Sequence, residues 1–282
     1  MSHNVFETIS SQYFQLTNSE KKVADYILGH RIDVQYMSIS ELAEECAVAD
    51  ATISRFCRRL GISGYNAFKL ELAKASTQSA APVSVDGLDR GDSCAQSCKR
   101  ALGESVAALE QTVHLLDPGQ VRRALELIQG AGRVVCMGQG GCMVIAQEAW
   151  SMFSTVSPKF QFVPDSHLQI STAAVMSPKD VVLYFSFSGS TRDLQDLLEV
   201  AREKKVKVIL ISRFPKSPGG QMADVVLQCG ANEGPLQAGS ATARMAQLFV
   251  LEVLFLELCR SSPAQVEKYQ ESIAEAVAKK HL

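Results

Sequence analysis

Five short, almost uninterrupted apolar runs in the C-terminal two thirds of the chain place the tightest limit on its fold. They occupy residues 134–137, 160–163, 181–185, 208–211 and 225–227. Runs of this kind are typical of strands that are buried on both faces of a parallel sheet. Helical patterns separate them near 142–156, 166–176, 192–204 and 217–222. Strands that alternate with helices form right-handed crossovers, so we predict a doubly wound α/β domain with three layers.

Further helices are expected on either side of this alternation. Upstream, five apolar residues recur at intervals of four, three, four and three and form one stripe: Leu102, Val106, Leu109, Val113 and Leu116. Downstream, helices near 239–260 and 264–280 end the chain. The first of these is apolar nearly all round, which predicts that it is buried, in part between subunits.

The chain changes character near residue 76, because only helical patterns precede that point. Residues 76–93 are rich in Ser, Ala, Gly and Asp, and they show a period of neither 2 nor 3.6. We therefore predict a helical domain at 1–76, a linker at 77–93 and the α/β domain at 94–282.

Two capping boxes start helices in the N-terminal part. Thr17 precedes Glu20 by three residues and opens a helix that Gly29 ends. Ser38 and Glu41 repeat the pattern and open a second helix. A third is predicted at roughly 50–60, and Gly61 ends it.

The last two of these helices have helix-turn-helix spacing. Ala43 is small where two helices cross, and Ala47 lies at the turn, where glycine is commoner. We expect apolar Ile53 and Phe56 to pack the second helix against the first. Residues 49–75 carry five Lys/Arg and two Asp/Glu in a chain of net charge -2. Hydroxyl and guanidinium groups in such a segment can bind the base edges and phosphates of DNA. The predicted DNA contacts are Thr52, Ser54, Arg55, Arg58, Arg59, Tyr65 and Lys69. The alternative is a small helical interaction module with a solvated charged face.

A serine-rich segment follows the third apolar run. It reads Ser-Phe-Ser-Gly-Ser-Thr at 186–191, and a helix begins just after it. Anions bind at such places, because free N–H groups and the helix dipole attract them at the carboxyl edge of a parallel sheet. The first run ends similarly, in Gly-Gln-Gly-Gly at 138–141. Either segment alone could be no more than a tight strand–helix turn, but two from adjacent strands indicate a ligand site.

These segments resemble a known family. VVLYFSFSGSTRD is similar to the hallmark loop of SIS (sugar isomerase) domains, and LTNSEKKVADYIL, MSISELAEEC and ATISRFCRRLGISGY complete a resemblance to RpiR-type sugar-phosphate-responsive regulators. The resemblance implies a flavodoxin-like sheet of five parallel strands, a phosphorylated sugar effector and at least a dimer. Together with the loop residues, it implies an effector site made of Gly138, Gln139, Gly140, His167, Ser186, Ser188, Gly189, Ser190, Thr191, Ser240 and Arg244.

The sequence departs from the family pattern at two positions. Cys142 stands where these regulators often have serine, and Ala49 stands where a serine commonly caps the recognition helix. We expect Asp50 to provide the cap instead, which would shift the start of that helix by one residue.

The expected function is therefore regulation of transcription of genes for sugar or amino-sugar catabolism, with repression that the effector relieves. The expected partners are a double-stranded DNA operator, a phosphorylated sugar and further copies of the chain, as a dimer or tetramer. The alternative is an isomerase or lyase of sugar phosphates with an appended helical domain. Its acid/base candidates are His167, Glu148 and Glu233.

Composition bears on location and on metal chemistry. The eight cysteines form no C-x-x-C pair and no Cys/His cluster with zinc-ligand spacing, so we expect reduced thiols and no metal or cofactor. The N-terminus does not resemble a secretory signal. The most apolar segment, 248–258, contains Glu252 and Glu257 and is too short to cross a bilayer. We expect a cytoplasmic protein with no membrane role.

Overall fold

The structure is a computed structural model that describes residues 4–31, 33–79, 93–231 and 240–279. The chain divides into two compact units, the second of which contains residues 104–231 and 241–282, so that the boundary falls within the helix that begins at Cys94. One unit contains the N-terminal helices and the other contains the sheet. Of the predicted linker, residues 77–79 belong to a helix, and residues 80–92 lie outside the described residues. The domain limits at 76 and 94 stay predictions.

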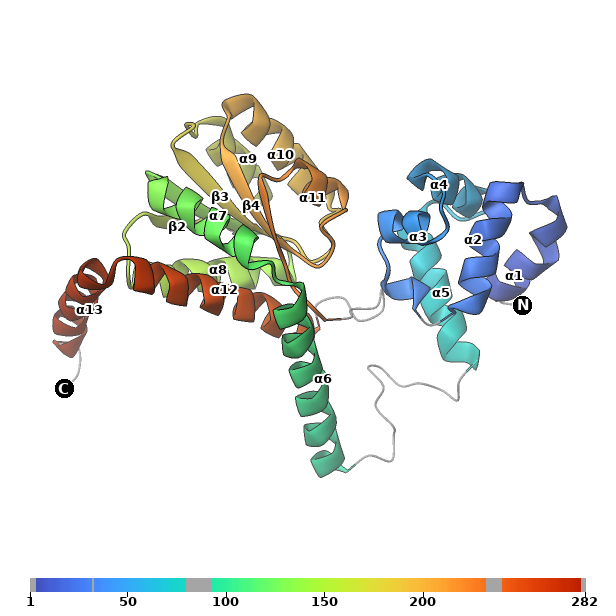
Figure 1. Cartoon of the computed structure of the whole chain (residues 1–282), viewed down its shortest axis with the longest axis horizontal. Coiled ribbons are helices and arrows are strands. Elements are labelled where there is room, and N and C mark those ends of the chain that lie inside the picture. Colours follow the sequence, from blue (N-terminus) through green and yellow to red (C-terminus); the bar gives the residue numbers. More distant parts are fainter. Residues whose placement is uncertain (1–3, 32, 80–92, 232–239, 280–282) are drawn as a thin grey trace. The chain divides into compact units, whose positions relative to one another are not determined.

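The N-terminal unit consists of helices around one small core (Figure 1). The described elements are α1 (Val5–Gln12), the short turn η1 (Tyr13–Gln15), α2 (Asn18–Gly29), η2 (Val34–Tyr36), α3 (Ile39–Glu45), α4 (Asp50–Arg59) and α5 (Tyr65–Ser79). Both capping boxes are present, with Thr17 and Ser38 as the N-caps of α2 and α3. The three predicted helices are therefore confirmed.

The turn between α3 and α4 explains how the two helices are joined. Ala47 has a φ of 51°, which is the left-handed conformation that glycine adopts at least cost. The N-cap of α4 is Ala49, and its side chain makes no capping bond. The expectation that Asp50 caps α4 is wrong. Its carboxylate instead accepts a hydrogen bond from Ser40 Oγ at 2.8 Å, which links α3 to α4.

The second unit is a three-layer α/β domain, as predicted. Its strands are β1 (Arg133–Gly138), β2 (Phe160–Phe162), β3 (Asp180–Phe185), β4 (Lys207–Ser212) and β5 (Val225–Gln228). All pairings are parallel, and the strand order is β2-β1-β3-β4-β5. The helices are α6 (Cys94–Leu115), α7 (Pro118–Gly130), α8 (Gly141–Ser154), α9 (Ser166–Ala174), α10 (Arg192–Lys204), α11 (Pro218–Met222), α12 (Ala241–Ser261) and α13 (Pro263–Ala278).

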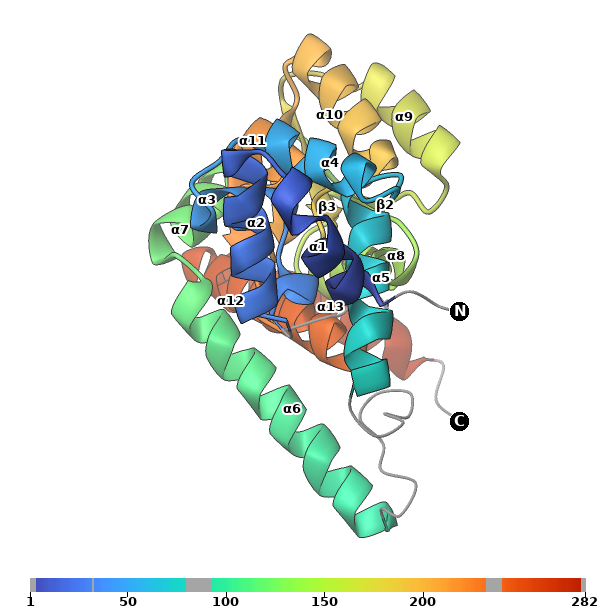
Figure 2. The same ribbon diagram turned by 90° about the vertical axis from the view of Figure 1, so that its right-hand side faces the viewer.

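Alternate residues of the three central strands, β1, β3 and β4, supply the two cores of this domain. Val134 and Cys136 of β1 pack toward α7, α8 and α12, whereas Val135 and Met137 pack toward α9 and α10. Figure 2 shows α9 and α10 on the face of the sheet opposite α12. This alternation is why the central strands read as nearly continuous apolar runs, whereas the edge strands β2 and β5 contain Gln161 and Gln228.

Two apolar helix faces are more exposed than the sequence suggests. In α6, Leu102, Val106 and Val113 are exposed, because the opposite face, which contains the buried residues Ala108 and Thr112, packs on the domain. In α12 one face is buried, but Met245 and Leu256 on the other are exposed. The predicted burial of α12 is therefore confirmed on one face, and its predicted burial between subunits stays a prediction.

The described residues also bear on membranes and metals. None of the described helices is long and apolar enough to cross a bilayer. Among the same residues, no three His, Cys, Asp or Glu side chains are placed to hold a metal ion. All eight cysteines are free thiols.

Candidate DNA-binding surface and candidate phosphate site

The exposed face of α4 carries the arginines of the predicted recognition helix. Arg55, Arg58 and Arg59 are exposed, while Ile53 and Phe56 on the other face are fully buried. The three arginines line a cavity of about 670 Å³ together with residues of α2 and its cap: Thr17, Ser19, Glu20, Thr52, Arg55, Arg58 and Arg59. We call this cavity the α2–α4 groove. Its cationic rim can receive an anionic phosphate backbone.

An ion pair fixes one side of the groove. Arg59 Nε lies 3.1 Å from Glu20 Oε1, and its guanidinium also donates to the Gln15 carbonyl at 3.0 Å. Burial would raise the pKa of Glu20, but hydrogen bonds from Thr17 and the charge of Arg59 outweigh it and hold that pKa below its ordinary value. Arg59 therefore joins α4 to α2. The exposed guanidinium groups of Arg55 and Arg58 form no ion pair with a described residue of α2.

Two predicted DNA contacts are not exposed. Thr52 is only 7% exposed, and its hydroxyl accepts a hydrogen bond from Arg55 at 3.2 Å. Tyr65 is 8% exposed; its ring belongs to the core and its hydroxyl donates to the Met37 carbonyl at 3.2 Å. The prediction that Thr52 lies on the exposed face of its helix is wrong, and Tyr65, predicted as a contact beyond that helix, also faces the apolar core. Ser54 and Lys69 are partly exposed.

The two predicted loops of the second unit begin side by side. Gly138, the last residue of β1, pairs with Phe185, the last residue of β3. From β1 the chain continues to β2 on one side of the sheet, while β3, β4 and β5 extend the other side. The two strands therefore flank the point where the strand order reverses, which is where open α/β sheets bind ligands.

Residues 186–191, here called the phosphate loop, are held in place by hydrogen bonds from the segment that follows β4. Gly189 has a φ of 60°, and its carbonyl accepts a hydrogen bond from the Gly219 N–H at 2.8 Å. Ser212 Oγ donates to the Phe187 carbonyl at 3.1 Å. Within the loop, the Ser186 hydroxyl accepts from the Gly189 N–H at 3.2 Å. The loop is thus fixed to the segment between β4 and α11 before any ligand arrives.

The end of the phosphate loop leaves hydrogen-bonding groups available to an anion. Thr191 is the N-cap of α10, but its side chain makes no capping bond. Its hydroxyl oxygen is buried and has no partner among the described residues. The first N–H groups of α10 also lack partners within the helix, as at any helix start. Ser188 is exposed beside them. This arrangement matches the needs of a bound phosphate.

The other side of the candidate site is formed by Arg244 and by the glycine-rich turn at residues 138–141, here called the first loop. Gly140 is the N-cap of α8, with a φ of 55° and a ψ of -127° that favour glycine. A Cβ atom at Gly141 would lie 3.4 Å from Arg244 Nε, so the Arg244 side chain of α12 reaches the first loop. A Cβ atom at Gly138 would lie 2.9 Å from the Cys142 carbonyl oxygen. The glycines therefore let the turn pack closely against α8 and the Arg244 side chain.

The remaining predicted effector residues lie in the first loop, in the phosphate loop and at the starts of α9 and α12. The Gln139 side chain donates to Gln169 Oε1 at 2.9 Å, and Gln169 is a buried residue that the sequence reasoning missed. His167 lies exposed near the start of α9, and Ser190 Oγ donates to the Ser188 carbonyl at 3.0 Å. Ser240 directly precedes α12 and is partly buried.

Two of the acid/base candidates of the alternative enzyme lie on different helices. Glu148 is exposed in α8, and His167 is exposed in α9. Glu233 lies outside the described residues.

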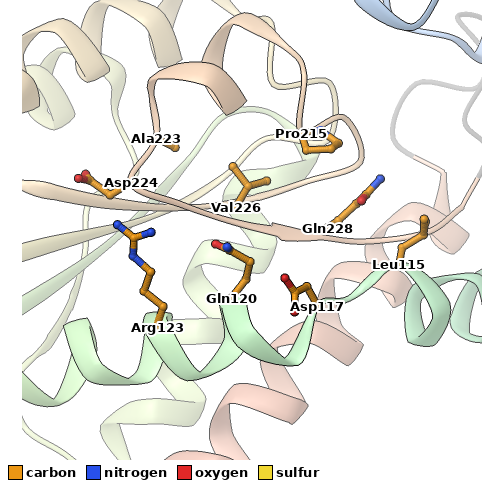
Figure 3. A pocket seen from close by; sticks show the side chains of 9 residues that line it. All are labelled: Leu115, Asp117, Gln120, Arg123, Pro215, Ala223, Asp224, Val226 and Gln228. Carbon is orange, nitrogen blue, oxygen red and sulfur yellow. The ribbon is translucent and has the colours of Figure 1, made fainter.

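A second cavity lies away from both loops. It has a volume of about 350 Å³ and runs between α7 and the outer edge of β5 (Figure 3). Gln120 and Arg123 of α7 extend toward Val226 and Asp224 across it. None of the predicted effector residues lines this cavity, so it does not take part in the site described above.

Comparisons with known proteins agree with this architecture. Residues 3–79 match the helix-turn-helix domain of the rpiR family, and residues 127–257 match the SIS domain. A protein of Haemophilus influenzae described as an HTH-type transcriptional regulator is 31% identical over 90% of this chain and 89% of its own. The HTH-type transcriptional regulator HexR of Escherichia coli is 30% identical over 89% of this chain and 86% of its own.

A solved structure covers both parts of the chain. The Vibrio vulnificus NanR protein, complexed with ManNAc-6P, superposes with a TM-score of 0.87 at 26% identity, over 99% of each chain. The relatives are named as transcriptional regulators, which fits a role outside catalysis. This chain therefore belongs to the rpiR family of helix-turn-helix transcriptional regulators that carry a SIS domain.

Proposed function

We propose that this regulator binds an operator through α4 and is controlled by a phosphorylated sugar held between the first loop and the phosphate loop. The observation that carries the effector half is the buried Thr191 hydroxyl without a partner, set at the start of α10 with the Arg244 side chain at the neighbouring loop. An uncompensated buried hydroxyl is costly, and a phosphate oxygen would compensate it.

Relatives support the class of ligand. The NanR structure holds ManNAc-6P, and that protein resembles this chain along its whole length. We therefore propose a phosphorylated sugar or amino sugar as the effector and genes of its catabolism as the targets, with repression relieved by the effector. Because the operator is chromosomal DNA, the protein would act in the cytoplasm; eight free thiols agree with that compartment.

Exposed apolar side chains support assembly with further copies of the chain. Leu102, Val106 and Val113 of α6 and Met245 and Leu256 of α12 are large apolar residues left in solvent. A symmetric dimer would cover such faces and would present two α4 helices to two half-sites. A single-chain mass of 30.6 kDa by light scattering at micromolar concentration would refute a dimer or tetramer.

Arg55→Ala is expected to weaken operator binding by about tenfold or more, because an arginine that contacts a base or phosphate contributes roughly 1–3 kcal/mol. The target would be a duplex selected from a random library by the wild-type protein, and binding would be followed by fluorescence anisotropy. The matched control is Lys22→Ala, which removes one exposed positive charge in α2 outside the α2–α4 groove. Equal affinities of wild type and Arg55→Ala would contradict the assignment of α4.

Ser188→Ala is expected to reduce the affinity for a sugar phosphate by about tenfold, since a hydrogen bond to a charged oxygen contributes roughly 1.5–3 kcal/mol. Thermal shift with ManNAc-6P, glucose 6-phosphate and glucosamine 6-phosphate would identify the ligand for calorimetry. Ser151→Ala, an exposed serine of α8, serves as the control. If none of these sugar phosphates stabilised the wild-type protein, the proposed effector class would be contradicted. If Ser188→Ala bound the sugar phosphate with normal affinity, the phosphate site would lie elsewhere.

A further inference from the structure

A buried carboxamide lies beneath the first loop and is not part of the family signature considered above. Gln169, in α9, is only 1% exposed. Its Nε2 donates to the Gly138 carbonyl at 3.0 Å and to the Val163 carbonyl at 2.8 Å. Its Oε1 accepts from Gln139 Nε2 at 2.9 Å. One side chain thus joins the ends of β1 and β2, the helix that carries His167, and the first loop.

These bonds determine which way the Gln139 amide points. A glutamine amide has two N–H donors, and both donors of Gln169 are used by carbonyl oxygens, which cannot donate in return. Only the oxygen of Gln169 is left to face Gln139, so Gln139 must turn its nitrogen inward. Its own oxygen then faces away from Gln169, on a side chain that is partly exposed.

Tyr184 supports the same orientation. It is fully buried in β3, and its hydroxyl has no hydrogen-bond partner of normal geometry among the described residues. Burial, with the charges of Asp193 and Cys142, raises the pKa of Tyr184, and the neighbouring Gln139 side chain opposes that rise. A donor group next to the phenol oxygen has this effect. This agrees with the orientation that the hydrogen bonds of Gln169 impose on the Gln139 amide.

We propose that Gln169 is the positioning residue of the effector site. It holds the Gln139 carboxamide so that an acceptor oxygen meets the sugar, which selects a ligand with a hydroxyl or amide N–H at that point. This inference rests on the proposed binding of a phosphorylated sugar between the two loops. The phosphate itself would be held by residues 186–191, to which Gln169 makes no hydrogen bond in the described structure.

The first test separates the sugar from the phosphate. Gln169→Met keeps the length of the side chain but removes all three hydrogen bonds. Calorimetry with ManNAc-6P, glucose 6-phosphate and inorganic phosphate should show a loss of about tenfold for the sugar phosphate that binds, and less than about twofold for inorganic phosphate. The double variant Gln139→Ala/Gln169→Met should bind no more weakly than Gln139→Ala, because both substitutions remove one interaction. Equal losses for all ligands, or additive losses in the double variant, would overturn the proposal.

The second test needs no ligand. Hydrogen exchange of the backbone amides at 139–142 in the free protein should become faster in Gln169→Met and stay unchanged in Gln161→Met, an exposed glutamine of β2. Unchanged exchange in Gln169→Met would overturn the positioning role. If the wild type bound neither sugar phosphate, the proposed effector would be wrong for those sugars, and this measurement alone would decide the role of Gln169.

Discussion

Gly189→Ala is expected to reduce the affinity for a sugar phosphate by at least about 100-fold. Gly189 has a φ of 60°, where an alanine costs roughly 1–2 kcal/mol. Its new Cβ atom would also lie 2.0 Å from Ser217 Oγ. Ser217 is fully buried and caps α11 by accepting from the Gly220 N–H, so it cannot turn aside without losing roughly 1 kcal/mol of capping. The phosphate loop would have to move instead.

Calorimetry with the sugar phosphate that the thermal-shift screen identifies would measure this loss. The control is Gly130→Ala at the end of α7, where a Cβ atom meets nothing within 4 Å and the backbone is helical. That variant should bind like the wild type. Operator binding in the absence of sugar phosphate should persist in Gly189→Ala, because α4 belongs to the other compact unit. Retention of wild-type affinity by Gly189→Ala would mean that the loop does not hold the phosphate.

Phe56→Ala should strongly destabilise the N-terminal unit and weaken operator binding, most of all near the unfolding temperature of that unit. Phe56 is fully buried in α4 and packs edge-to-face on Phe68 of α5, with ring centroids 5.9 Å apart. Loss of a buried phenylalanine costs roughly 3–5 kcal/mol. A domain of this size has a total stability of roughly 4–12 kcal/mol, so the variant would lose a large part of it. Thermal unfolding should show an early transition for this unit only.

The matched control for Phe56 is Phe14→Ala in the same unit. Phe14 is 90% exposed, so its removal should change stability by less than about 0.5 kcal/mol and leave operator binding intact. Phe56→Ala should still bind the sugar phosphate, since the sheet and both loops lie in the second unit. An unchanged melting profile in Phe56→Ala would contradict the described helical core.

Sequence patterns were sufficient to predict those features that depend on residues close together in the chain. The capping boxes at Thr17 and Ser38 predicted helix starts because a cap and its partner lie within one turn. The three central strands could be found because each is apolar on both faces. Helix α5 was not predicted, although Tyr65, Phe68 and Leu72 recur at helical spacing in the sequence.

Burial could not be predicted with the same accuracy. Thr52 and Tyr65 are polar residues in a basic segment, and only the packing of α4 and α5 shows that they face inward. Asp50 looked like a cap, yet its partner is Ser40 in another helix. The apolar stripe of α6 is regular, but the face that meets the domain contains Ala108 and Thr112 instead, because Thr112 Oγ1 accepts the Gly230 N–H at 2.8 Å.

The sequence by itself determined the order of elements, the two capping boxes and the two loops that follow β1 and β3, because each depends on residues close together in the chain. Only the tertiary structure decided that Gly138 lies opposite Phe185, that Arg244 reaches Gly141, and that Gln169 supports the first loop. These are contacts between residues far apart in sequence. They depend on strand order and on the path of buried side chains, which no local spacing records.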